Sequence, residues 1–300
     1  MNGKSDRGVM EIPNSTNGPA GEVAFRDAYR ANGYFFPLRA VSEHEAAAYR
    51  GNLEEHEAAT GGPLRREFRQ KSHLLFTWLA GLTRKPAILD AVEQLLGPDL
   101  LVWQTAFFIK EAHDPGMVTW HQDSTYWGLS EPEVVTAWVA LSPSTPDSGC
   151  VRVMPGTHRS DQVSHVESAN PDNLLTRGQE IAVEVDESQA VSMLLRPGEM
   201  SLHHIRTFHN SEPNRSNDRR IGFAIRYIPT RIRQTSFDGD TATLVRGADR
   251  FGHFELEPAP RSDLAPDAVR YHTDVTSRRS RMYGRASPAA DKRGGPSAAQ

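Results

Sequence analysis

The sequence predicts an α+β fold that is mainly β, in which antiparallel sheets close as a jelly roll or barrel and N-terminal helices pack on one outer face. Two observations predict it. Between residues 99 and 230 the chain carries about eight β-branched and aromatic runs, separated by clusters of Pro, Gly, Asp and Asn. The first third of the chain is rich in helix formers, and no long helical pattern interrupts the later runs.

The helical third divides into four segments. An amphipathic pattern over residues 22–36 predicts a short helix that leads into a strand. Ser42, followed three residues later by Glu45, forms a capping-box pattern that predicts the start of a second helix. Two further helices are expected over residues 73–82 and 86–96, and the last one begins at a proline and ends before a glycine.

Composition also divides the chain into a domain and two ends. Residues 1–20 and 284–300 are rich in Gly, Ser, Pro, Asn and Ala, which predicts disordered termini. The stretch between them, residues 21–283, is expected to form a single domain. Its core barrel is expected over about residues 99–230, and residues 230–283 form a candidate lid.

Charge and cysteine content exclude several classes of partner. The 34 Lys and Arg residues are outnumbered by 38 Asp and Glu, so the chain lacks the basic excess that nucleic acid binding requires. No apolar stretch approaches the roughly 18 residues of a membrane helix, and the N-terminus lacks an apolar signal segment. The single cysteine, Cys150, cannot form an intramolecular disulfide. We therefore expect a cytoplasmic protein that acts on a small molecule, without nucleic acid or membrane partners.

The sharpest chemical signal is the segment WHQD at residues 120–123. Residues i and i+2 of a strand point to the same face, so His121 and Asp123 are expected to present an imidazole nitrogen and a carboxylate oxygen to one ion. The same His-x-acid spacing occurs at three other places, namely His165/Glu167, His253/Glu255 and His272/Asp274. The motif by itself is therefore a weak signal.

The sequence that follows distinguishes the first pair from the others. A second histidine, His209, lies on a later predicted strand. Two histidines and one carboxylate leave three positions of an ion open, as in non-haem Fe(II) oxygenases. A structural zinc site would instead use four protein ligands, usually including thiolates. We expect His121, Asp123 and His209 to be the catalytic iron ligands, while His203, on the same predicted strand as His209, is an alternative third ligand.

An arginine follows at the start of the next predicted strand. Residues 213–218 form a turn by composition, so His209 is expected to end one strand and Arg220 to open its antiparallel neighbour. A guanidinium at that point can bind a carboxylate in a bidentate fork, and the expected partner is the distal carboxylate of 2-oxoglutarate. The adjacent Arg219 faces the other side of the strand, toward solvent or a salt bridge.

These segments together resemble the phytanoyl-CoA dioxygenase family of Fe(II)/2-oxoglutarate oxygenases. The resemblance rests on WHQD at residues 120–123, SGCVRVMPGTHR at residues 148–159 and HNSEPNRSNDRR at residues 209–220, and it covers about residues 22–230. It implies a double-stranded β-helix, a cupin-like jelly roll, with Fe(II), 2-oxoglutarate and O2 as cofactors.

The resemblance also implies roles for individual residues. Iron is implied to bind at His121, Asp123 and His209, and 2-oxoglutarate at Arg220 with Ser211 as a helper. Since the metal carboxylate is present, the resemblance does not favour halogenation, which in another subset of the superfamily accompanies replacement of that carboxylate by Ala or Gly.

A closer similarity to the ectoine hydroxylase branch adds two positions. Gln104, seventeen residues before His121, and Trp127, six residues after it, match cofactor-pocket positions of that branch. Ala106 stands where the branch is expected to carry an arginine, so ectoine itself is not the expected substrate.

The expected function is hydroxylation, or another oxidation, of an unactivated C–H bond in a small metabolite, in secondary metabolism, with release of succinate and CO2. Two alternatives stay open from the residues alone. One is a cupin-like metalloenzyme that does not use 2-oxoglutarate, and the other is a non-catalytic binding barrel.

Overall fold

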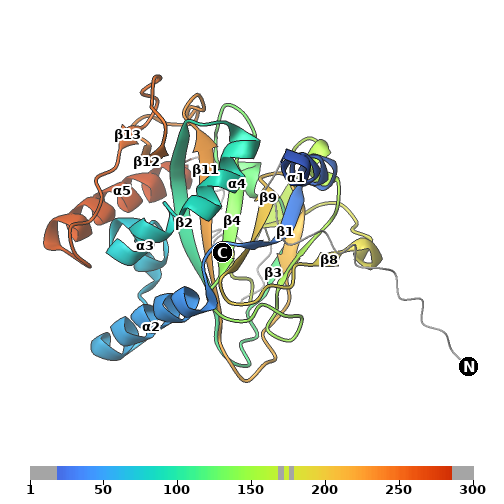
Figure 1. Ribbon diagram of the computed structural model, residues 1–300, viewed down its shortest axis with the longest axis horizontal. Helices are drawn as coiled ribbons and strands as arrows, with labels where there is room; N and C mark the ends of the chain where they lie inside the picture. The colour runs from blue at the N-terminus through green and yellow to red at the C-terminus, as the bar shows by residue number, and fades with distance from the viewer. Residues whose placement is uncertain (1–18, 168–171, 176–178, 286–300) are drawn as a thin grey trace, which may run out of the picture.

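The computed structural model describes residues 19–167, 172–175 and 179–285 (Figure 1). Its helices are α1 (Pro19–Asn32), α2 (Glu43–Thr60), α3 (Thr77–Leu82), α4 (Pro86–Leu96) and α5 (Pro266–Arg285). Short 3-10 helices are η1 (Arg66–Arg69), η2 (Ser72–Leu74), η3 (Asp123–Tyr126), η4 (Thr157–Arg159) and η5 (Glu187–Gln189). The strands are β1 (Tyr34–Arg39), β2 (Leu100–Lys110), β3 (Val118–His121), β4 (Val135–Ala140), β5 (Val151–Val153), β6 (His165–Glu167), β7 (Gln179–Ile181), β8 (Val191–Ser192), β9 (Glu199–His204), β10 (His209–Ser211), β11 (Arg220–Pro229), β12 (Thr241–Arg246) and β13 (Glu255–Leu256).

The strands form two main sheets, and the prediction of a mainly β fold with a few helices is confirmed. The larger sheet has the strand order β1-β9-β4-β11-β2-β12-β13, and the smaller one has the order β3-β10-β5-β8. Strands β6 and β7 form a separate pair. Neighbours in the larger sheet run antiparallel, apart from the parallel pair β12-β13. The larger sheet therefore includes strands on both sides of the range expected for the barrel.

The expected N-terminal helices are present, with one difference. Ser42 Oγ accepts a hydrogen bond from the Glu45 amide at 3.1 Å, and the Glu45 carboxylate accepts one from the Ser42 amide at 2.9 Å, which confirms the capping box of α2. The single helix expected over residues 73–82 is instead divided into η2 and α3. Helix α3 begins at Thr77 because Asp263, far along the chain, accepts the Thr77 amide at 2.7 Å.

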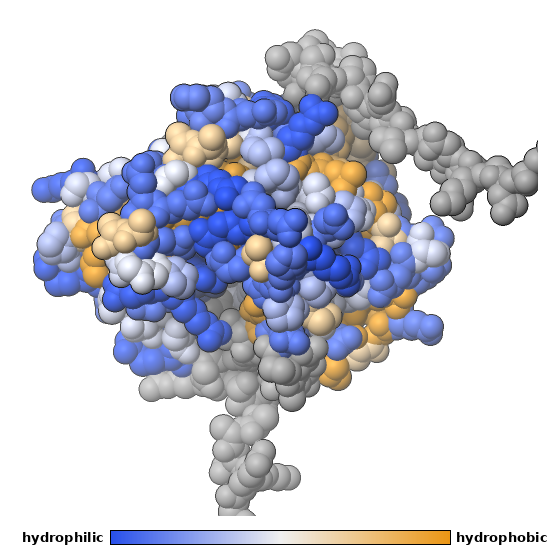
Figure 2. All heavy atoms as spheres, turned by 90° about the horizontal axis from the view of Figure 1, so that it is seen from below, coloured by the Kyte–Doolittle hydropathy of each residue, from blue (hydrophilic) through white to orange (hydrophobic). Residues whose placement is uncertain are grey.

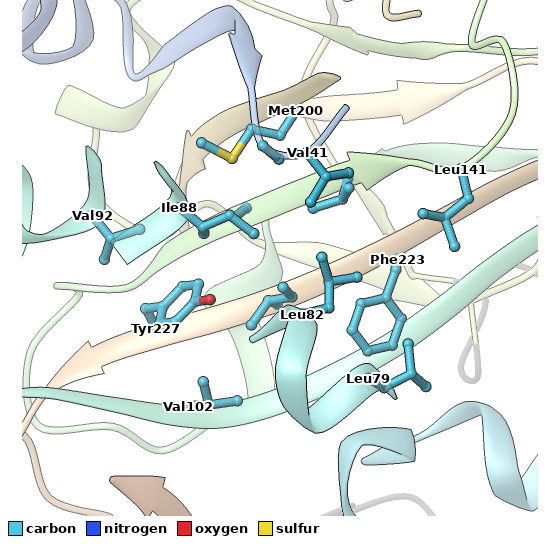
Figure 3. Packing of buried hydrophobic residues seen from close by; sticks show 14 of the residues in the cluster. Val41, Leu79, Leu82, Ile88, Val92, Val102, Leu141, Met200, Phe223 and Tyr227 are labelled. Atoms are coloured by element: carbon cyan, nitrogen blue, oxygen red, sulfur yellow. The ribbon is translucent and has the colours of Figure 1, made fainter. Parts of the chain in front are cut away.

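The main hydrophobic core lies between these helices and one face of the larger sheet. Figure 3 shows side chains of α3 and α4 meeting alternate residues of β11, among them Phe223 and Tyr227. Tyr227 is fully buried and donates its hydroxyl proton to the Thr83 carbonyl at 2.8 Å. The odd-numbered residues of β11 therefore anchor the helical layer, which leaves the even-numbered residues for the opposite face.

That opposite face meets the smaller sheet. Trp138 and Ala224 of the larger sheet pack with Val151 and Val153 of the smaller one. The functional pocket described below opens between the two sheets, beside this cluster.

Gly222 is required where β11 passes beneath the Trp138 ring. A Cβ atom added at Gly222 would lie 1.8 Å from Trp138 Cζ2, so an alanine there must displace the indole. We expect Gly222→Ala to lower the free energy of unfolding by about 1–3 kcal/mol, measured by urea denaturation. The control is Gly51→Ala on α2, where nothing lies within 4 Å of the added Cβ and helix propensity favours alanine. Equal stability of the two variants would contradict the prediction.

The C-terminal segment is attached to the edge of the larger sheet. Strand β12 pairs antiparallel with β2, and α5 follows β13, a helix that the sequence patterns did not indicate. No residue of 230–283 is found among the described residues that line the pocket, and the lid role of that segment stays a prediction. The termini expected to be disordered lie largely outside the described residues, although α1 and α5 extend into both ranges.

A buried network of charged and polar side chains connects the C-terminal segment to the larger sheet. Lys71 and Glu257 form an ion pair in which neither side chain is exposed. Glu257 also accepts hydrogen bonds from the hydroxyls of Thr241 and Thr243, each at 2.6 Å, and lies 3.2 Å from His73 Nε2. Burial raises the pKa of Glu257, but the charge of Lys71 and the contacts with His73 outweigh it and hold that pKa below its usual value.

The surface is polar where it can be seen. Figure 2 shows mostly hydrophilic residues on the face viewed from below, with apolar residues in scattered small groups. In the part of the chain that the structure describes, no helix combines the length and the apolar character needed to cross a bilayer.

Candidate metal centre and pocket

The two histidines of the predicted metal site are brought together by strand pairing in the smaller sheet. His121 ends β3 and His209 begins β10, and the two residues are direct partners in the antiparallel ladder. Paired residues share a face, so the rings lie side by side with centroids 4.0 Å apart. Eighty-seven intervening residues separate these two positions, and the register of β3 against β10 places them in contact.

Asp123 completes the cluster, but not from the strand that was expected. It is the first residue of η3, after β3 has ended, and its amide donates to the Ile205 carbonyl at 3.1 Å. The prediction that His121 and Asp123 share one strand is therefore wrong, because the chain turns at Gln122. The turn still directs the carboxylate to the imidazoles: one potential ligand atom from each of the three residues lies within 4.8 Å of the others.

The hydrogen bonds of the His121 and His209 imidazoles leave one nitrogen of each ring available to bind a metal. His121 Nδ1 lies 2.9 Å from the Thr119 carbonyl oxygen, and His209 Nδ1 lies 2.9 Å from the Thr207 carbonyl oxygen. A carbonyl only accepts, so each Nδ1 carries the proton and each Nε2 keeps a free lone pair. Burial and the neighbouring His121 hold the pKa of His209 well below its usual value, which favours the neutral form that binds metals.

The Asp123 carboxylate is also suited to bind a metal. Oδ2 of Asp123 is buried without a hydrogen-bond partner, and its side chain is 9% exposed. Burial raises the pKa of Asp123, but the charge of Arg226, with Nη2 3.5 Å from Oδ2, outweighs burial and keeps the carboxyl ionised. Two imidazoles and one ionised carboxylate are the donor set expected for Fe(II) with open positions.

The competing histidines occupy other places. His203 lies on β9 of the larger sheet, so the prediction that it shares a strand with His209 is wrong, although the ring centroids are 4.9 Å apart. His165 Nε2 accepts a hydrogen bond from the Gln122 amide, and His272 Nε2 lies 2.7 Å from the Gln70 carbonyl. Within the described residues, one cluster of three metal-binding side chains is found, and it contains none of these histidines.

Arg220 is a buried cation that faces the pocket from β11. Its residue exposure is 1%, Nη1 donates to the Gly149 carbonyl at 2.7 Å, and Nε has no hydrogen-bond partner. Its guanidinium carbon lies 5.3 Å from the centroid of the Trp138 ring. Arg219 points the other way, to Glu57 and other carboxylates, as predicted.

The path of the chain between His209 and Arg220 differs from the prediction. Strands β10 and β11 are not neighbours, because β10 pairs with β3 and β5 in the smaller sheet, whereas β11 lies in the larger sheet. The connecting turn therefore crosses from one sheet to the other. It places Arg220 across the pocket from the histidines rather than next to them.

Lys110 is a residue of this site that the sequence patterns did not indicate. It is the direct ladder partner of Arg220, is fully buried, and donates from Nζ to Ser211 Oγ at 2.7 Å and also to the Glu212 carbonyl. Ser211 itself lines the pocket. Burial, and then the charge of Arg220, lower the pKa of Lys110 to about 7. The available signal was a lysine at the end of a strand that is mainly apolar in sequence.

The two positions taken from the ectoine branch lie beside the pocket. Gln104 and Trp127 are not among the described residues that line it. The Gln104 amide donates to the Gln70 side chain, and Gln104 is the ladder partner of Arg226. Trp127 packs against Trp103 and lies beneath the guanidinium of Arg226, at 4.8 Å from ring centroid to Cζ. Their binding roles stay predictions.

Comparison with known proteins decides the family. The family model for phytanoyl-CoA dioxygenase matches residues 29–222. The chain belongs to the phytanoyl-CoA dioxygenase family. A probable α-ketoglutarate-dependent hypophosphite dioxygenase of Stutzerimonas stutzeri is 28% identical over 220 residues, which is 72% of each chain. Ectoine dioxygenases also match, which confirms the local similarity to that branch.

Solved structures of phytanoyl-CoA dioxygenase type agree with this assignment. The apo structure of the non-heme monooxygenase ThoJ superposes with a TM-score of 0.78 and 36% identity, over 87% of this chain and 98% of ThoJ. CytC3 with Fe(II) and α-ketoglutarate superposes with a TM-score of 0.59 and 27% identity, over 81% of this chain and 96% of CytC3. The predicted enzyme class, an Fe(II)- and 2-oxoglutarate-dependent dioxygenase that uses O2, is confirmed.

Proposed function

We propose that this enzyme hydroxylates an unactivated C–H bond of a small metabolite in secondary metabolism, with Fe(II) bound by His121, Asp123 and His209. The observation that carries the proposal is the convergence of these three side chains in one pocket with the buried guanidinium of Arg220, whose Nε has no hydrogen-bond partner. Three protein ligands would leave positions of a bound Fe(II) open for a bidentate co-substrate and O2. Bound Fe(II) and 2-oxoglutarate supply the oxidising chemistry, with release of succinate and CO2.

The protein contributes binding and orientation. The backbone carbonyls of Thr119 and Thr207 fix the tautomer and rotation of the two imidazoles, so that both Nε2 atoms face the same point. Arg220 offers a buried fork for the distal carboxylate of 2-oxoglutarate. Ser211, whose hydroxyl accepts a hydrogen bond from Lys110, lines the same pocket as Arg220. Apolar pocket residues, including Phe108, keep water from the reacting atoms.

We also propose the finer fold and location. The two facing antiparallel sheets support a double-stranded β-helix, or cupin-like jelly roll, with the N-terminal helices covering the outer face of the larger sheet. The polar surface and the buried unpaired Cys150 are compatible with a cytoplasmic enzyme.

An anaerobic titration tests the proposed function. Adding Fe(II) and then 2-oxoglutarate to the full chain should produce the weak visible charge-transfer band of the iron chelate. Arg220→Gln should weaken 2-oxoglutarate binding by about 30-fold or more, because it removes the buried partner of a charged group. Arg246→Gln, which removes a surface arginine paired with Asp90 and Glu93, should bind normally. Absence of the band in the folded wild-type protein would favour a metalloenzyme that does not use 2-oxoglutarate.

The pH dependence of 2-oxoglutarate binding should report the titration of the Lys110 ammonium. Its pKa is lowered to about 7 in the free protein, and a bound dianion favours the charged ammonium. Affinity for 2-oxoglutarate should therefore be highest below about pH 7 and fall as the pH rises further, by up to about tenfold per pH unit, because binding then requires proton uptake. Dissociation constants measured across this range by the same titration should lose the step in Lys110→Met. A step that persists in Lys110→Met would assign it to another group.

A further inference from the structure

The pocket face of the larger sheet carries a row of polar residues that the proposed iron and co-substrate sites do not use. Arg226 of β11 is the direct ladder partner of Thr136 on β4 and of Gln104 on β2. Thr136 is in turn the partner of His203 on β9. Directly paired residues share a face of the sheet, so these four side chains form one row, which we call the polar row.

Every member of the polar row has an unsatisfied buried atom. His203 Nδ1, Thr136 Oγ1, Arg226 Nε and Gln104 Oε1 are all buried without a hydrogen-bond partner. Buried polar atoms in folded proteins almost always have partners. A run of four exceptions across adjacent strands, three of them in residues that line the pocket, indicates a place that a polar ligand fills.

Arg226 is the charged member, and its surroundings hold it in place without neutralising it fully. Its side chain is 9% exposed and its guanidinium carbon lies over the Trp127 ring, 4.8 Å from the centroid. Its carboxylate contact is Asp123, at 3.5 Å and without hydrogen-bond geometry. Metal binding would draw on the charge of that same carboxylate, so Asp123 cannot fully compensate Arg226.

A formal charge count points to the missing partner. Fe(II) brings two positive charges, and Arg220 and Arg226 bring one each. Asp123 brings one negative charge and 2-oxoglutarate brings two. One positive charge is left in a buried pocket, before Lys110 is considered. An uncompensated buried charge is costly, so a second ligand with one negative charge is favoured.

Arg220 and Arg226 serve separate positions. They lie six residues apart on β11, which corresponds to roughly 20 Å between their Cα atoms. The small residues Gly222 and Ala224 lie between them, and the Trp138 ring covers Gly222. A distal carboxylate bound at Arg220 is therefore not shared with Arg226.

We propose that Arg226 is the specificity-determining residue for the primary substrate, which is a small monocarboxylic acid, and that it binds the substrate carboxylate with Thr136 as a neighbouring hydroxyl donor. This inference rests on the proposed function and adds the substrate class to it. A planar guanidinium with a free Nε matches a carboxylate in a two-point fork.

The test uses the full chain loaded anaerobically with Fe(II) and 2-oxoglutarate. The probes are amino acids, hydroxy acids, and aliphatic and aromatic carboxylic acids, each paired with its primary amide. Perturbation of the charge-transfer band reports binding, and succinate release in air reports turnover. We expect acids, and not their amides, to perturb the band. Arg226→Gln should bind the responding acid about 30-fold or more weakly while still forming the Fe(II)/2-oxoglutarate band, with a smaller loss of 2-oxoglutarate affinity than in Arg220→Gln, and Arg246→Gln should match wild type.

The outcomes separate the two levels of the proposal. A wild-type protein that never forms the band contradicts the proposed function itself. A normal band combined with amides that bind as well as acids, or with no response to any acid, overturns the inference and leaves the function standing. Loss of the band in Arg226→Gln also overturns the inference, because Arg226 would then act on Asp123 as a positioning residue.

Discussion

Asp123→Asn should reduce the coupled turnover of 2-oxoglutarate to succinate by at least about a thousandfold. The amide has nearly the same shape as the carboxylate but lacks the charge that the metal requires. It also leaves Arg226, 3.5 Å away, without its anionic neighbour. The measurements are succinate formation and Fe(II) binding by calorimetry, with circular dichroism to confirm that the variant is folded.

Asp161→Asn provides the matched control for this variant. The Asp161 side chain is 98% exposed and forms a surface ion pair with Arg206 at 3.2 Å, so its loss should leave turnover within about twofold of wild type. An Asp123→Asn enzyme that keeps more than about a tenth of the wild-type turnover would contradict the assignment of Asp123 as a metal ligand.

Glu257→Gln should lower the free energy of unfolding by about 3–5 kcal/mol. The substitution leaves the Lys71 ammonium buried without its counter-charge, since both side chains have no exposed surface. It also replaces an acceptor on which the hydroxyls of Thr241 and Thr243 converge. Urea denaturation monitored by circular dichroism measures the change.

Two further variants make this prediction specific. Glu255→Gln removes a half-exposed carboxylate two residues earlier, which pairs with Arg278 at 3.2 Å, and should cost less than about 1 kcal/mol. The double variant Lys71→Met/Glu257→Gln should lose at least about 1 kcal/mol less than the sum of the two single variants, because neither charge is then left alone. If the stability losses of the two single variants simply add in the double variant, the ion pair does not couple Lys71 and Glu257.

Local chemistry was the part of this protein most easily anticipated. The Ser42 and Glu45 capping box specifies its own helix start, because both partners lie within one turn. Strand alternation predicted that Arg219 and Arg220 face opposite sides. Their contacts agree, although β11 begins only at Arg220: Arg219 pairs with Glu57, and Arg220 donates to the Gly149 carbonyl. Helix α5 was missed because its sequence is polar and lies in a region read as lid and tail.

Features that depend on pairing between distant segments were harder to foresee. The division of the helix expected over residues 73–82 depends on Asp263, and the turn at Gln122 that moves Asp123 off the strand depends on contacts with Gln162 and the residue 206 carbonyl. Strands β10 and β11, close in sequence, belong to different sheets. In each case the contacting residues, or the paired strands, are too far apart in the sequence for a helix or strand periodicity pattern to include both.

The donor types, their order along the chain and the mainly β character could be predicted from the amino-acid sequence, because residue chemistry and strand periodicity are local properties. The contacts between the side chains of the site depend on the folded arrangement of distant strands. The register of β3 against β10 brings His121 to His209, the ladder of β2 with β11 sets Lys110 beside Arg220, and the pairing of β2, β11, β4 and β9 places Arg226 in the polar row. These placements follow from non-local hydrogen bonding and packing, whose partners lie tens to more than a hundred residues apart in the chain.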